Sequence, residues 1–476
     1  MSDIAAESGL AVSAWSRRPL WLVPLLVGAG LRVTCAALSI GYFAADDIKY
    51  VLEPAWVWLD SPEAAYPSEI RSSFFARLVG SLFLLGDALG VKSSTGLLKL
   101  SYLLLGLYSL IAIPAIFALT RRLFDLRAAC YAAWLMAAYA LMPRLSTYAL
   151  IGVAAIPLVT LGFACLVRAS QEASAVSAMI GGLCLALASM IRFQSGLLFL
   201  GVAGLWAIDA LRSREGWSRW RALLLGGGLG LALQAIWDSV TRGVPLESLW
   251  MYVDFNLHRA SEFGTSPWYA YIPILLLLTL PPCTVALGPA LMRAARRAAL
   301  VSVPLGVYVA AHSAIPHKEE RFLFTILPLL WVLLGAALAE RSRANGWLGI
   351  RAVRGFALLN LVLLIPATLS DGNRATVVPL AETAAKPNVA RIVVVGRFVI
   401  PTLYLDRRTA VVRLAPDRFP RGLETLGPLP HTSRLLFVEA PLDTQLHDLQ
   451  AYGLRCESAN AYPGDWLDRL LVWLNP

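Results

Sequence analysis

The sequence predicts a polytopic α-helical membrane protein, and three observations support this. The 476-residue chain is 58% hydrophobic and only 15% charged. Its apolar residues fall in long runs, and a run of about 20 apolar residues is enough to span a bilayer core. Most arginines lie in short loops between the runs. The positive-inside rule explains the net charge of +10, because cytoplasmic loops carry an excess of arginine. The charge therefore does not indicate nucleic-acid binding.

The apolar runs predict about eleven membrane spans. The first run follows two arginines and is long, with no clear cleavage site before Gly41, so we interpret it as an uncleaved span rather than a signal peptide. The spans are expected near residues 20–41, 97–120, 127–143, 149–167, 174–190, 195–211, 221–239, 268–291, 299–315, 322–340 and 352–369.

The arginine clusters predict the orientation of the chain. They fall on one side, which the positive-inside rule makes cytoplasmic, at residues 17–18, 121–122, 212–221, 293–297 and 341–354. The other side then receives two long loops, 42–96 and 240–267, and the short turn 317–321. Within the first loop, "SEIRSSFFARLVGSLFLLGDALG" is interpreted as one or two amphipathic helices on the membrane, because counting it as a span would reverse the arginine asymmetry.

The composition changes after residue 370. Residues 1–370 contain all predicted spans, whereas residues 371–476 contain none. In this C-terminal part "RIVVVG", "TLYL", "AVVRL" and "RLLFVEA" are typical of short strands, and "DTQLHDLQAYG" is typical of a helix. We expect a small α/β domain on the non-cytoplasmic side. It has no glycine-rich phosphate loop, so no nucleotide is predicted there.

The first candidate site residues are acidic and follow the first span. Asp46 and Asp47 stand at the start of "DDIKYVLEP", and Glu53 is seven residues after Asp46. A carboxylate at the membrane surface can act as a general base that takes the proton of an attacking hydroxyl group. The pair is equally typical of a helix N-cap or a solvated loop. Glu53 would share a face with Asp46 if the segment is helical, and it is a candidate for substrate binding.

Further candidates come from both long loops. Arg71 in "IRSSFF" is a candidate for substrate binding, although an arginine at this place is also typical of a headgroup contact. The second long loop and its flanks mix polar groups with aromatic rings, which suits carbohydrate but also describes an aromatic belt at the interface. The candidates for substrate binding there are Asp238, Asn256, Trp268 and Tyr269.

The turn "HKEER" places five ionisable residues between two apolar segments. His317, Lys318 and Arg321 offer cationic donors, and His317 and Arg321 would share one face of a helix. Such groups can hold a phosphate by charge-assisted hydrogen bonds, or they can form a salt-bridged helix cap. No metal site is predicted, because the cations beside His317 and Glu319 would repel a metal ion and no Asp-x-Asp occurs. The six cysteines suggest neither a disulfide framework nor a metal site.

"HKEERF" at residues 317–322 resembles the signature of glycosyltransferase family 22, the dolichyl-phosphate-mannose-dependent mannosyltransferases of N-glycan and GPI-anchor assembly with bacterial relatives. "ADDIKYVLEP" resembles the family's first-loop motif, and "IRS" its Arg-Ser step. "DSVTRG", Asn256 and "FGTSPWYAY" resemble its later motifs in the same order. Three positions depart from the pattern: Asp47 stands where Glu is usual, Arg242 where Tyr is common, and Ser266 where His is common.

The resemblance implies a GT-C fold and an inverting transfer of a sugar, with mannose favoured, from a polyprenyl-phosphate donor to a hydroxyl of a glycan or glycolipid. It assigns the base to Asp46, with Asp47 beside it, and the departing phosphate to His317, Lys318 and Arg321. No cofactor is implied. Two alternatives remain open: a GT-C transferase of another sugar, such as a pentose or aminosugar, and a transporter or flippase of lipid-linked sugars. A transporter would more often show pseudo-symmetric halves.

The chain is Ala-, Leu- and Arg-rich and contains no Asn-x-Ser/Thr sequon. These features favour a bacterial inner membrane with the site facing the periplasm. An endoplasmic reticulum membrane with the site facing the lumen is the alternative. The expected partners are the polyprenyl-phosphate sugar, the acceptor and membrane lipid.

Overall fold

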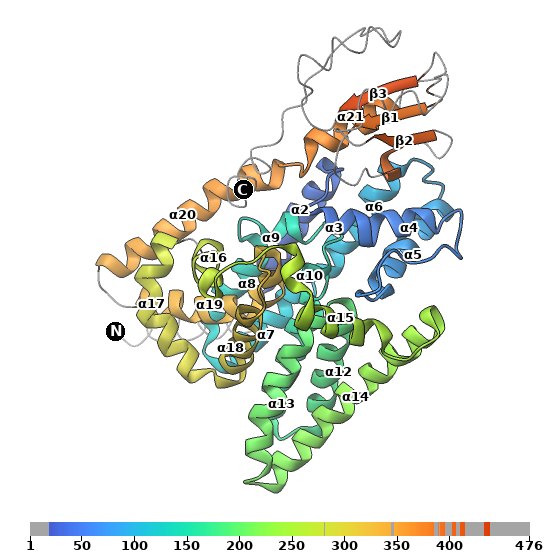
Figure 1. Cartoon of the computed structure of the whole chain (residues 1–476). Helices are drawn as coiled ribbons and strands as arrows, with labels where there is room; N and C mark the ends of the chain where they lie inside the picture. Colours follow the sequence, from blue (N-terminus) through green and yellow to red (C-terminus); the bar gives the residue numbers. More distant parts are fainter. Residues whose placement is uncertain are drawn as a thin grey trace.

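The computed structural model describes residues 19–279, 281–343, 347–384, 389, 391–395, 402–405, 410–414 and 433–437. Most of this part of the chain is helical (Figure 1). Its first half forms α2 (Leu22–Leu38), α3 (Ala45–Asp47), the π-helical turn η1 (Ile48–Leu52), α4 (Glu53–Val57), α5 (Phe74–Ala88), α6 (Ser94–Ser109), α7 (Ala112–Leu123), α8 (Leu126–Ala138), α9 (Met142–Leu145), α10 (Ile151–Ala154), α11 (Ile156–Glu172), α12 (Ala175–Ile191), the 3₁₀ turn η2 (Phe193–Ser195), α13 (Gly196–Ala210) and α14 (Arg214–Arg242).

The second half alternates long helices with 3₁₀ turns before it reaches a small sheet. In chain order it forms α15 (Glu247–His258), η3 (Ala260–Phe263), η4 (Trp268–Ala270), α16 (Tyr271–Leu278), α17 (Pro281–Arg297), α18 (Ala299–Ala314), η5 (Glu320–Ile326), α19 (Leu327–Arg343), α20 (Trp347–Leu369), α21 (Arg374–Ala384), β1 (Arg391–Val395), η6 (Thr402–Tyr404), β2 (Ala410–Leu414) and β3 (Ser433–Phe437).

Six helical stretches in the described residues are long and apolar enough to cross a membrane. They are Ser94–Leu123, Ile151–Glu172, Phe193–Ala210, Arg214–Arg242, Glu320–Arg343 and Arg351–Leu369. A seventh would be the pair Val285–Arg297 and Ala299–Ala314, which is bent by 108°. Other apolar helices, α2 and α12 among them, are shorter. The range 268–291 is wrong as one continuous span, because α16 ends at Leu278 and α17 begins at Pro281. The count of about eleven stays a prediction.

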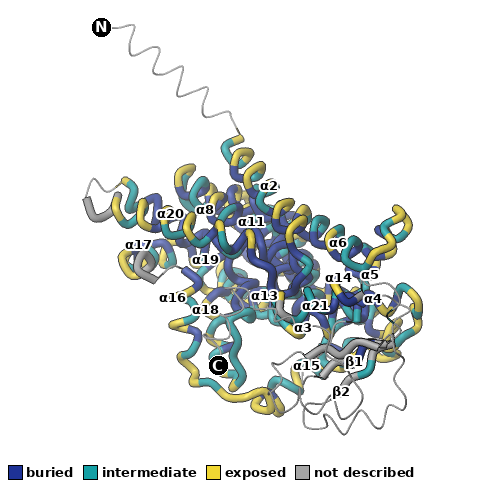
Figure 2. The backbone as a smooth tube through the Cα atoms, turned by 90° about the horizontal axis from the view of Figure 1, so that it is seen from above, coloured by how far each residue is buried: buried dark blue, intermediate teal, exposed yellow. Residues whose placement is uncertain are grey.

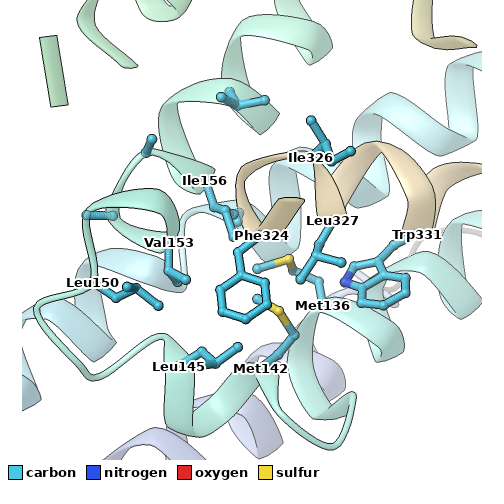
Figure 3. Packing of buried hydrophobic residues seen from close by; sticks show 14 of the residues in the cluster. Met136, Met142, Leu145, Leu150, Val153, Ile156, Phe324, Ile326, Leu327 and Trp331 are labelled. Atoms are coloured by element: carbon cyan, nitrogen blue, oxygen red, sulfur yellow. The ribbon is translucent and has the colours of Figure 1, made fainter. Parts of the chain in front are cut away.

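The core of the bundle forms around α19. This helix is buried along most of its length, and it packs against α7, α8 and α17. Figure 2 shows the buried segments gathered in the interior around α11. Trp331 of α19 lies against Tyr139, with ring centroids 4.4 Å apart, and Figure 3 shows Phe324, Leu327 and Trp331 among the methionine side chains of the neighbouring segments. The end of the turn that precedes α19 is therefore fixed by the core.

Helices α12 and α14 approach each other through glycine. A Cβ atom at Gly182 would lie 2.3 Å from the carbonyl oxygen of Leu223, and one at Gly226 would lie 2.0 Å from that of Met179. Small residues let helix backbones come this close in membrane bundles. The contact fixes the C-terminal end of α12, from which Arg192 follows.

The arginine-rich loops meet at one end of the bundle. Ion pairs join Arg122 to Glu172, Arg293 to Glu340 and Arg343 to Asp125. Residues that are far apart in the sequence are thus linked at this end, as expected if the loops share one side of a membrane.

The described C-terminal part contains a three-stranded parallel sheet in the order β2-β1-β3, which Figure 1 shows at one end of the molecule. The prediction of a strand at "TLYL" is wrong, since Thr402–Tyr404 form the 3₁₀ turn η6. The predicted helix "DTQLHDLQAYG" lies outside the described residues. The domain boundary at residue 370 and the side of the membrane stay predictions.

Two contacts tie this part to the membrane helices. The buried carboxylate of Asp371 accepts hydrogen bonds from the Ser39 hydroxyl and from the backbone amides of Ile40 and Gly41. The Tyr404 hydroxyl donates to the carbonyl of Ile40. The segment that leaves α2 toward Asp46 is therefore held from the C-terminal side.

Candidate active site

A cavity of about 160 Å³ lies where the two long loops meet the turn 317–321. We call loop 42–96 the first outer loop and loop 240–267 the second outer loop, after their predicted side of the membrane. Its walls come from segments that are far apart in the sequence, so the fold alone brings them together. The lining residues are Asp46, Asp47, Tyr50, Ile70, Arg71, Ser72, Leu150, Ile151, Met190, Ile191, Arg192, Phe193, Gln194, Tyr252, Phe255, Asn256, Ala260, Phe263, His312, Ile315, His317, Glu319, Arg321 and Phe322.

Asp46 lies in this cavity between two arginines. Its Oδ2 is 2.6 Å from Nη2 of Arg71 and 3.2 Å from Nη2 of Arg321. Among the described residues, its Oδ1 has no hydrogen-bond or ion-pair partner. Burial favours the neutral acid, but the two guanidinium groups outweigh it and lower the pKa of Asp46. The carboxylate is thus ionised at neutral pH and keeps one oxygen available.

Asp47 has a different environment. Only 2% of the residue is exposed, and its Oδ2 accepts the backbone N–H of Ala44, the residue before α3, as the third helical residue of a capping box does. Burial raises the pKa of Asp47 to about 7, although the Ala44 N–H and Arg321 oppose the shift. Two adjacent carboxylates therefore titrate far apart, because one is salt-bridged and the other is buried.

Glu53 does not reach the cavity. The π-helical turn η1 between it and Asp46 is wider than an α-helical turn, so the two residues do not share the face that continuous α-helix would give them. Its carboxylate accepts the backbone amides of Thr402 and Leu403 and the Thr402 hydroxyl. The structure thus assigns Glu53 to anchoring the C-terminal segment, and we do not retain it as a substrate ligand.

The turn 317–321 brings its basic groups together through a carboxylate. His317 Nε2 lies 2.7 Å from Oε1 of Glu319, and Nε of Arg321 donates to Oε2 of the same group. These neighbours overcome the effect of burial and lower the pKa of Glu319. The prediction that His317 and Arg321 share a helix face is wrong, since His317 precedes the 3₁₀ turn that begins at Glu320.

Lys318 is absent from the residues that line the cavity. Its ammonium group donates to the carbonyl oxygens of Ser266, at 3.1 Å, and Ile315, at 2.6 Å. It therefore joins the second outer loop to the turn. Of the three predicted phosphate ligands, the structure brings only His317 and Arg321 to the cavity.

Of the second-loop candidates, only Asn256 lines the cavity. Its amide donates to the carbonyl of Tyr252 one turn earlier. Asp238 is fully buried and binds the backbone amide and hydroxyl of Ser248 at the start of α15, so it joins α14 to α15 and is not available to a substrate. Trp268 and Tyr269 lie outside the cavity with more than half of each residue exposed.

Arg71 lines the cavity as predicted by its place in the first outer loop. Besides the Asp46 ion pair, its guanidinium carbon lies 4.4 Å from the centroid of the Tyr50 ring. Its carbonyl oxygen accepts a hydrogen bond from Arg242, which also binds the carbonyl groups of Ser68 and Glu69. Arg242 at the end of α14 thereby fixes the loop segment 68–71, which presents Arg71.

The sequence did not point to Tyr50 or Tyr252, nor to two basic residues of the cavity. Arg192 follows α12 in "MIRFQS", and His312 lies in the last turn of α18. Each is an ionisable residue next to or within a predicted span, which is itself a signal of function in membrane proteins. Among the described residues, no group of three or more His, Cys, Asp or Glu side chains could hold a metal ion.

Solved structures identify the fold. The chain superposes on ArnT from Cupriavidus metallidurans bound to undecaprenyl phosphate with a TM-score of 0.62, covering 94% of this chain and 96% of that one, at 14% identity. The apo state of ArnT gives a TM-score of 0.57, covering 88% and 90% of the two chains at 15% identity. The predicted GT-C fold is confirmed, and the chain is an integral membrane protein.

Curated relatives match parts of the chain. GPI mannosyltransferase 3 of Trypanosoma brucei brucei is 28% identical over 199 residues, which are 35% of this chain and 36% of the relative. Alpha-1,2-mannosyltransferase ALG9 of Mus musculus is 29% identical over 192 residues, 32% of this chain and 31% of the relative. The match thus spans about a third of the length of these relatives. Residues 65–382, more than half of the 476-residue chain, match the model of the Alg9-like mannosyltransferase family. The chain therefore belongs to the Alg9-like mannosyltransferase family, as the motifs around Asp46 and His317 predicted.

Proposed function

We propose that this protein transfers mannose from a polyprenyl-phosphate donor to a hydroxyl group of a glycan or glycolipid acceptor. Family membership supports the mannosyl transfer. The fold is shared with ArnT, whose structure contains undecaprenyl phosphate, and this supports a lipid-linked donor. A cavity beside the membrane helices is a suitable position for a phosphate whose polyprenyl chain stays in the bilayer.

The observation that carries the proposal is the position of Asp46. Its carboxylate lines the cavity and remains ionised between Arg71 and Arg321. Among the described residues, its Oδ1 has no partner. In a single displacement, the acceptor oxygen bonds to the anomeric carbon while the bond from that carbon to the phosphate oxygen breaks. The bonding electron pair leaves with the phosphate, and the hydroxyl proton goes to Asp46. The product has the inverted anomeric configuration.

The low pKa of Asp46 is compatible with this role. A hydroxyl group becomes acidic only as it bonds to the anomeric carbon, so its proton leaves late and a weak base suffices. Asp47, with a pKa of about 7, would be the stronger base at neutral pH. Its burial and its bond to Ala44 favour a role in holding α3 instead. Geometry is the first criterion for a general base, and pKa the second.

Arg321 and His317 are the proposed phosphate ligands in the turn 317–321. A guanidinium or imidazolium group near the departing phosphate oxygen stabilises the negative charge that develops there. Tyr50, Tyr252 and Asn256 line the same cavity and provide the aromatic and amide groups that suit a sugar ring. Trp268 and Tyr269 are exposed and remain proposed as contacts at the membrane interface or with the acceptor.

For location, we propose a bacterial inner membrane with the cavity on the periplasmic side. The ion-paired arginine loops at one end of the bundle support a cytoplasmic position for that end. The alternative is an endoplasmic reticulum membrane with the cavity facing the lumen.

The test uses the purified protein, synthetic polyprenyl-phosphate mannose and a panel of glycan and glycolipid acceptors. We expect transfer from this donor, a product of inverted anomeric configuration by nuclear magnetic resonance, and a rate about 10²–10⁴ lower with Asp46→Asn. Transfer from another polyprenyl-phosphate sugar, but not from polyprenyl-phosphate mannose, would contradict mannose as the transferred sugar and leave the rest of the proposal standing. Retention of configuration would exclude the one-step mechanism. Movement of the donor across a vesicle membrane without any transfer would identify a transporter.

A further inference from the structure

The described bundle buries three arginine side chains. In two of them every guanidinium nitrogen has a hydrogen-bond partner. Nε, Nη1 and Nη2 of Arg32 all donate to oxygens of α2, α6, α8 and Ser146. The three guanidinium nitrogens of Arg144 donate to the carbonyl groups of Cys35, Ala367 and Thr368. When this fold uses a buried guanidinium group to join helices, it gives a partner to every nitrogen.

Arg192 differs from both. Only 7% of the residue is exposed, yet Nε and Nη2 have no hydrogen-bond partner among the described residues. No ion pair involving Arg192 occurs in that part of the chain either. The side chain follows the last turn of α12 and lines the cavity that contains Asp46. A buried cation without a partner is costly, since burial removes its hydration.

The guanidinium group of Arg192 has a defined position. Its carbon lies 5.4 Å from the centroid of the Phe322 ring, and the Tyr308 hydroxyl lies near it. Tyr308 is itself fixed, because its hydroxyl donates to the carbonyl of Phe322. Gly152 lies alongside, where an added Cβ would be 3.1 Å from Nη1. The missing side chain at Gly152 leaves the room that the guanidinium occupies.

The other arginines of the cavity already have anionic partners. Arg71 and Arg321 share the Asp46 carboxylate, and Arg321 also binds the carboxylate of Glu319, whose other oxygen contacts His317. These groups largely neutralise one another. Arg192 therefore supplies the positive charge in the cavity that has no anionic counterpart among the described residues, and an incoming anion would find two free N–H groups there.

A second buried group with no partner lines the same cavity. Nδ1 of His312 lies 2.8 Å from the carbonyl oxygen of Tyr308. A carbonyl group only accepts, so Nδ1 carries a hydrogen, and Nε2 of the neutral ring is an acceptor. Nε2 has no partner among the described residues, and only 2% of His312 is exposed. The ring lies 6.4 Å from that of Phe322, on which Arg192 also lies.

From these two groups we infer that Arg192 binds the phosphate of the lipid-linked donor, and that His312 Nε2 accepts a hydrogen bond from a hydroxyl of its sugar. The inference rests on the proposed function and deepens it, because it assigns the charge that attracts the donor to Arg192 rather than to the turn 317–321. A sugar phosphate is the ligand class that offers an anionic acceptor to Arg192 and a hydroxyl donor to His312. Arg321 then stabilises the leaving phosphate once its carboxylate partners rearrange.

The experiment measures thermal unfolding of the full-length protein in detergent with short-chain polyprenyl phosphate, polyprenyl-phosphate mannose or the uncharged polyprenol. Specific binding to the folded state raises the unfolding temperature. We expect both phosphates to stabilise the wild type and polyprenol not to. Arg192→Met should bind both phosphates about 10- to 100-fold more weakly, the usual loss for hydrogen bonds to a charged group. Without ligand, Arg192→Met should be at least as stable as the wild type, because an uncompensated buried charge is gone.

Three further variants sharpen the test. Arg192→Lys keeps the charge without the planar fork and should fall between wild type and Arg192→Met. His312→Phe should bind polyprenyl phosphate as the wild type does but polyprenyl-phosphate mannose more weakly. Arg259→Met removes an exposed arginine that pairs with Glu262 and should respond to ligands as the wild type does.

Each failure has its own signature. A wild type that polyprenyl phosphate does not stabilise would contradict the lipid-phosphate donor and this inference together. A wild type and an Arg192→Met variant that respond equally would overturn the role of Arg192 and leave the donor proposal standing. A His312→Phe variant that discriminates between the two phosphates as the wild type does would remove His312 from sugar recognition.

Discussion

Oδ2 of Asp46 lies 3.2 Å from Nη2 of Arg321, which joins the first outer loop to the turn that follows α18. The proposed base and a proposed phosphate ligand are thus in direct contact in the ligand-free structure. An acceptor hydroxyl can bind Oδ1 of Asp46, whereas a phosphate that binds Arg321 would compete with Oδ2 of Asp46 for the same guanidinium group. Donor binding, by offering Arg321 another anion, would weaken its hold on Asp46 and make the carboxylate a stronger base.

Asp46→Asn should lower the rate of the chemical step by about 10²–10⁴, the usual contribution of general acid–base catalysis. The amide keeps the size of the side chain but cannot take the hydroxyl proton. Donor binding should persist, because Arg192 lies on another segment. Single-turnover rates at saturating donor, measured with a donor-binding assay, test this.

Asp47→Asn is the matched variant, with the same change at the adjacent residue. Asparagine can still accept the Ala44 N–H, so a smaller loss of rate is expected. A large loss with Asp47→Asn and near-normal turnover with Asp46→Asn would exchange the two roles. Loss of donor binding with Asp46→Asn would show that Asp46 mainly shapes the site.

Arg321→Ala should slow transfer by about 10²–10³, the usual effect of removing one preorganised charged donor. Arg321→Lys should restore only part of the rate, because an ammonium cannot bind Asp46 and Glu319 in the same planar geometry. Lys318→Ala is the neighbouring control, and turnover within a few-fold of the wild type is expected, since Lys318 binds carbonyl groups outside the cavity. If Arg321→Ala and Lys318→Ala lost turnover equally and severely, Lys318 would have to be counted as a phosphate ligand.

The sequence placed Asp46 and Arg321 in one candidate site, but it did not predict their direct ion pair. Each lies in a polar segment next to a long apolar run, and the alternation of arginine-rich loops puts both segments on one side of the membrane. The same reasoning located most helices. It failed at 268–291, where the apolar run is continuous but the chain interrupts the helix near Thr279.

The misassigned residues share a physical reason. Glu53, Asp238 and Lys318 bind backbone groups that are distant in the sequence or belong to another element, and no local pattern reveals such partners. The π-helical turn η1 also leaves no obvious mark in "IKYVL". Arg192 was missed for the opposite reason: between two apolar runs it resembled an ordinary loop arginine, whereas its guanidinium group lies against Gly152 and Phe322, which are distant in the sequence.

Asp47 should make stability depend on pH. Its pKa is raised from 3.8 to about 7 in the folded protein. Between these values the folded chain holds a proton that the unfolded chain has released, so stability falls as pH rises from about 4 to about 7. Asp47→Asn cannot ionise and avoids this loss. The unfolding temperature of the variant minus that of the wild type, followed by tryptophan fluorescence, should therefore be larger at pH 8 than at pH 5.

The control for this pH effect is Glu63→Gln, which alters an exposed carboxyl group in the same loop. Its difference from the wild type should stay constant over the same pH range. A difference for Asp47→Asn that is also constant would mean that Asp47 is ionised in the folded protein throughout, and that Arg321 outweighs its burial.

Glu53→Ala should release the C-terminal segment from the first outer loop. The amides of Thr402 and Leu403 donate to this carboxylate. Losing hydrogen bonds to a charged group should increase their hydrogen exchange by about 10- to 100-fold. Glu53→Gln keeps an acceptor oxygen and should be intermediate, while Glu63→Ala should leave the exchange unchanged. Donor binding should be affected little, because Glu53 does not line the cavity. Unchanged exchange of both amides in Glu53→Ala would mean that other contacts hold the segment.

The last prediction concerns orientation, because the proposed donor requires the cavity to face away from the cytoplasm. Ser261 is exposed in the second outer loop, and Ser218 is exposed near the start of α14, within the arginine-rich segment 212–221. In a background without the six native cysteines, Ser261→Cys should react with a membrane-impermeant thiol reagent in intact cells, and Ser218→Cys only after permeabilisation. The physical reason is the arginine excess of the segment with Ser218, which favours retention in the cytoplasm. If Ser218→Cys reacted in intact cells and Ser261→Cys did not, the orientation of the chain in the membrane would be the reverse of the predicted one. Asp46 and Arg192 would then face the cytoplasm, and a donor presented on the outer leaflet could not reach them.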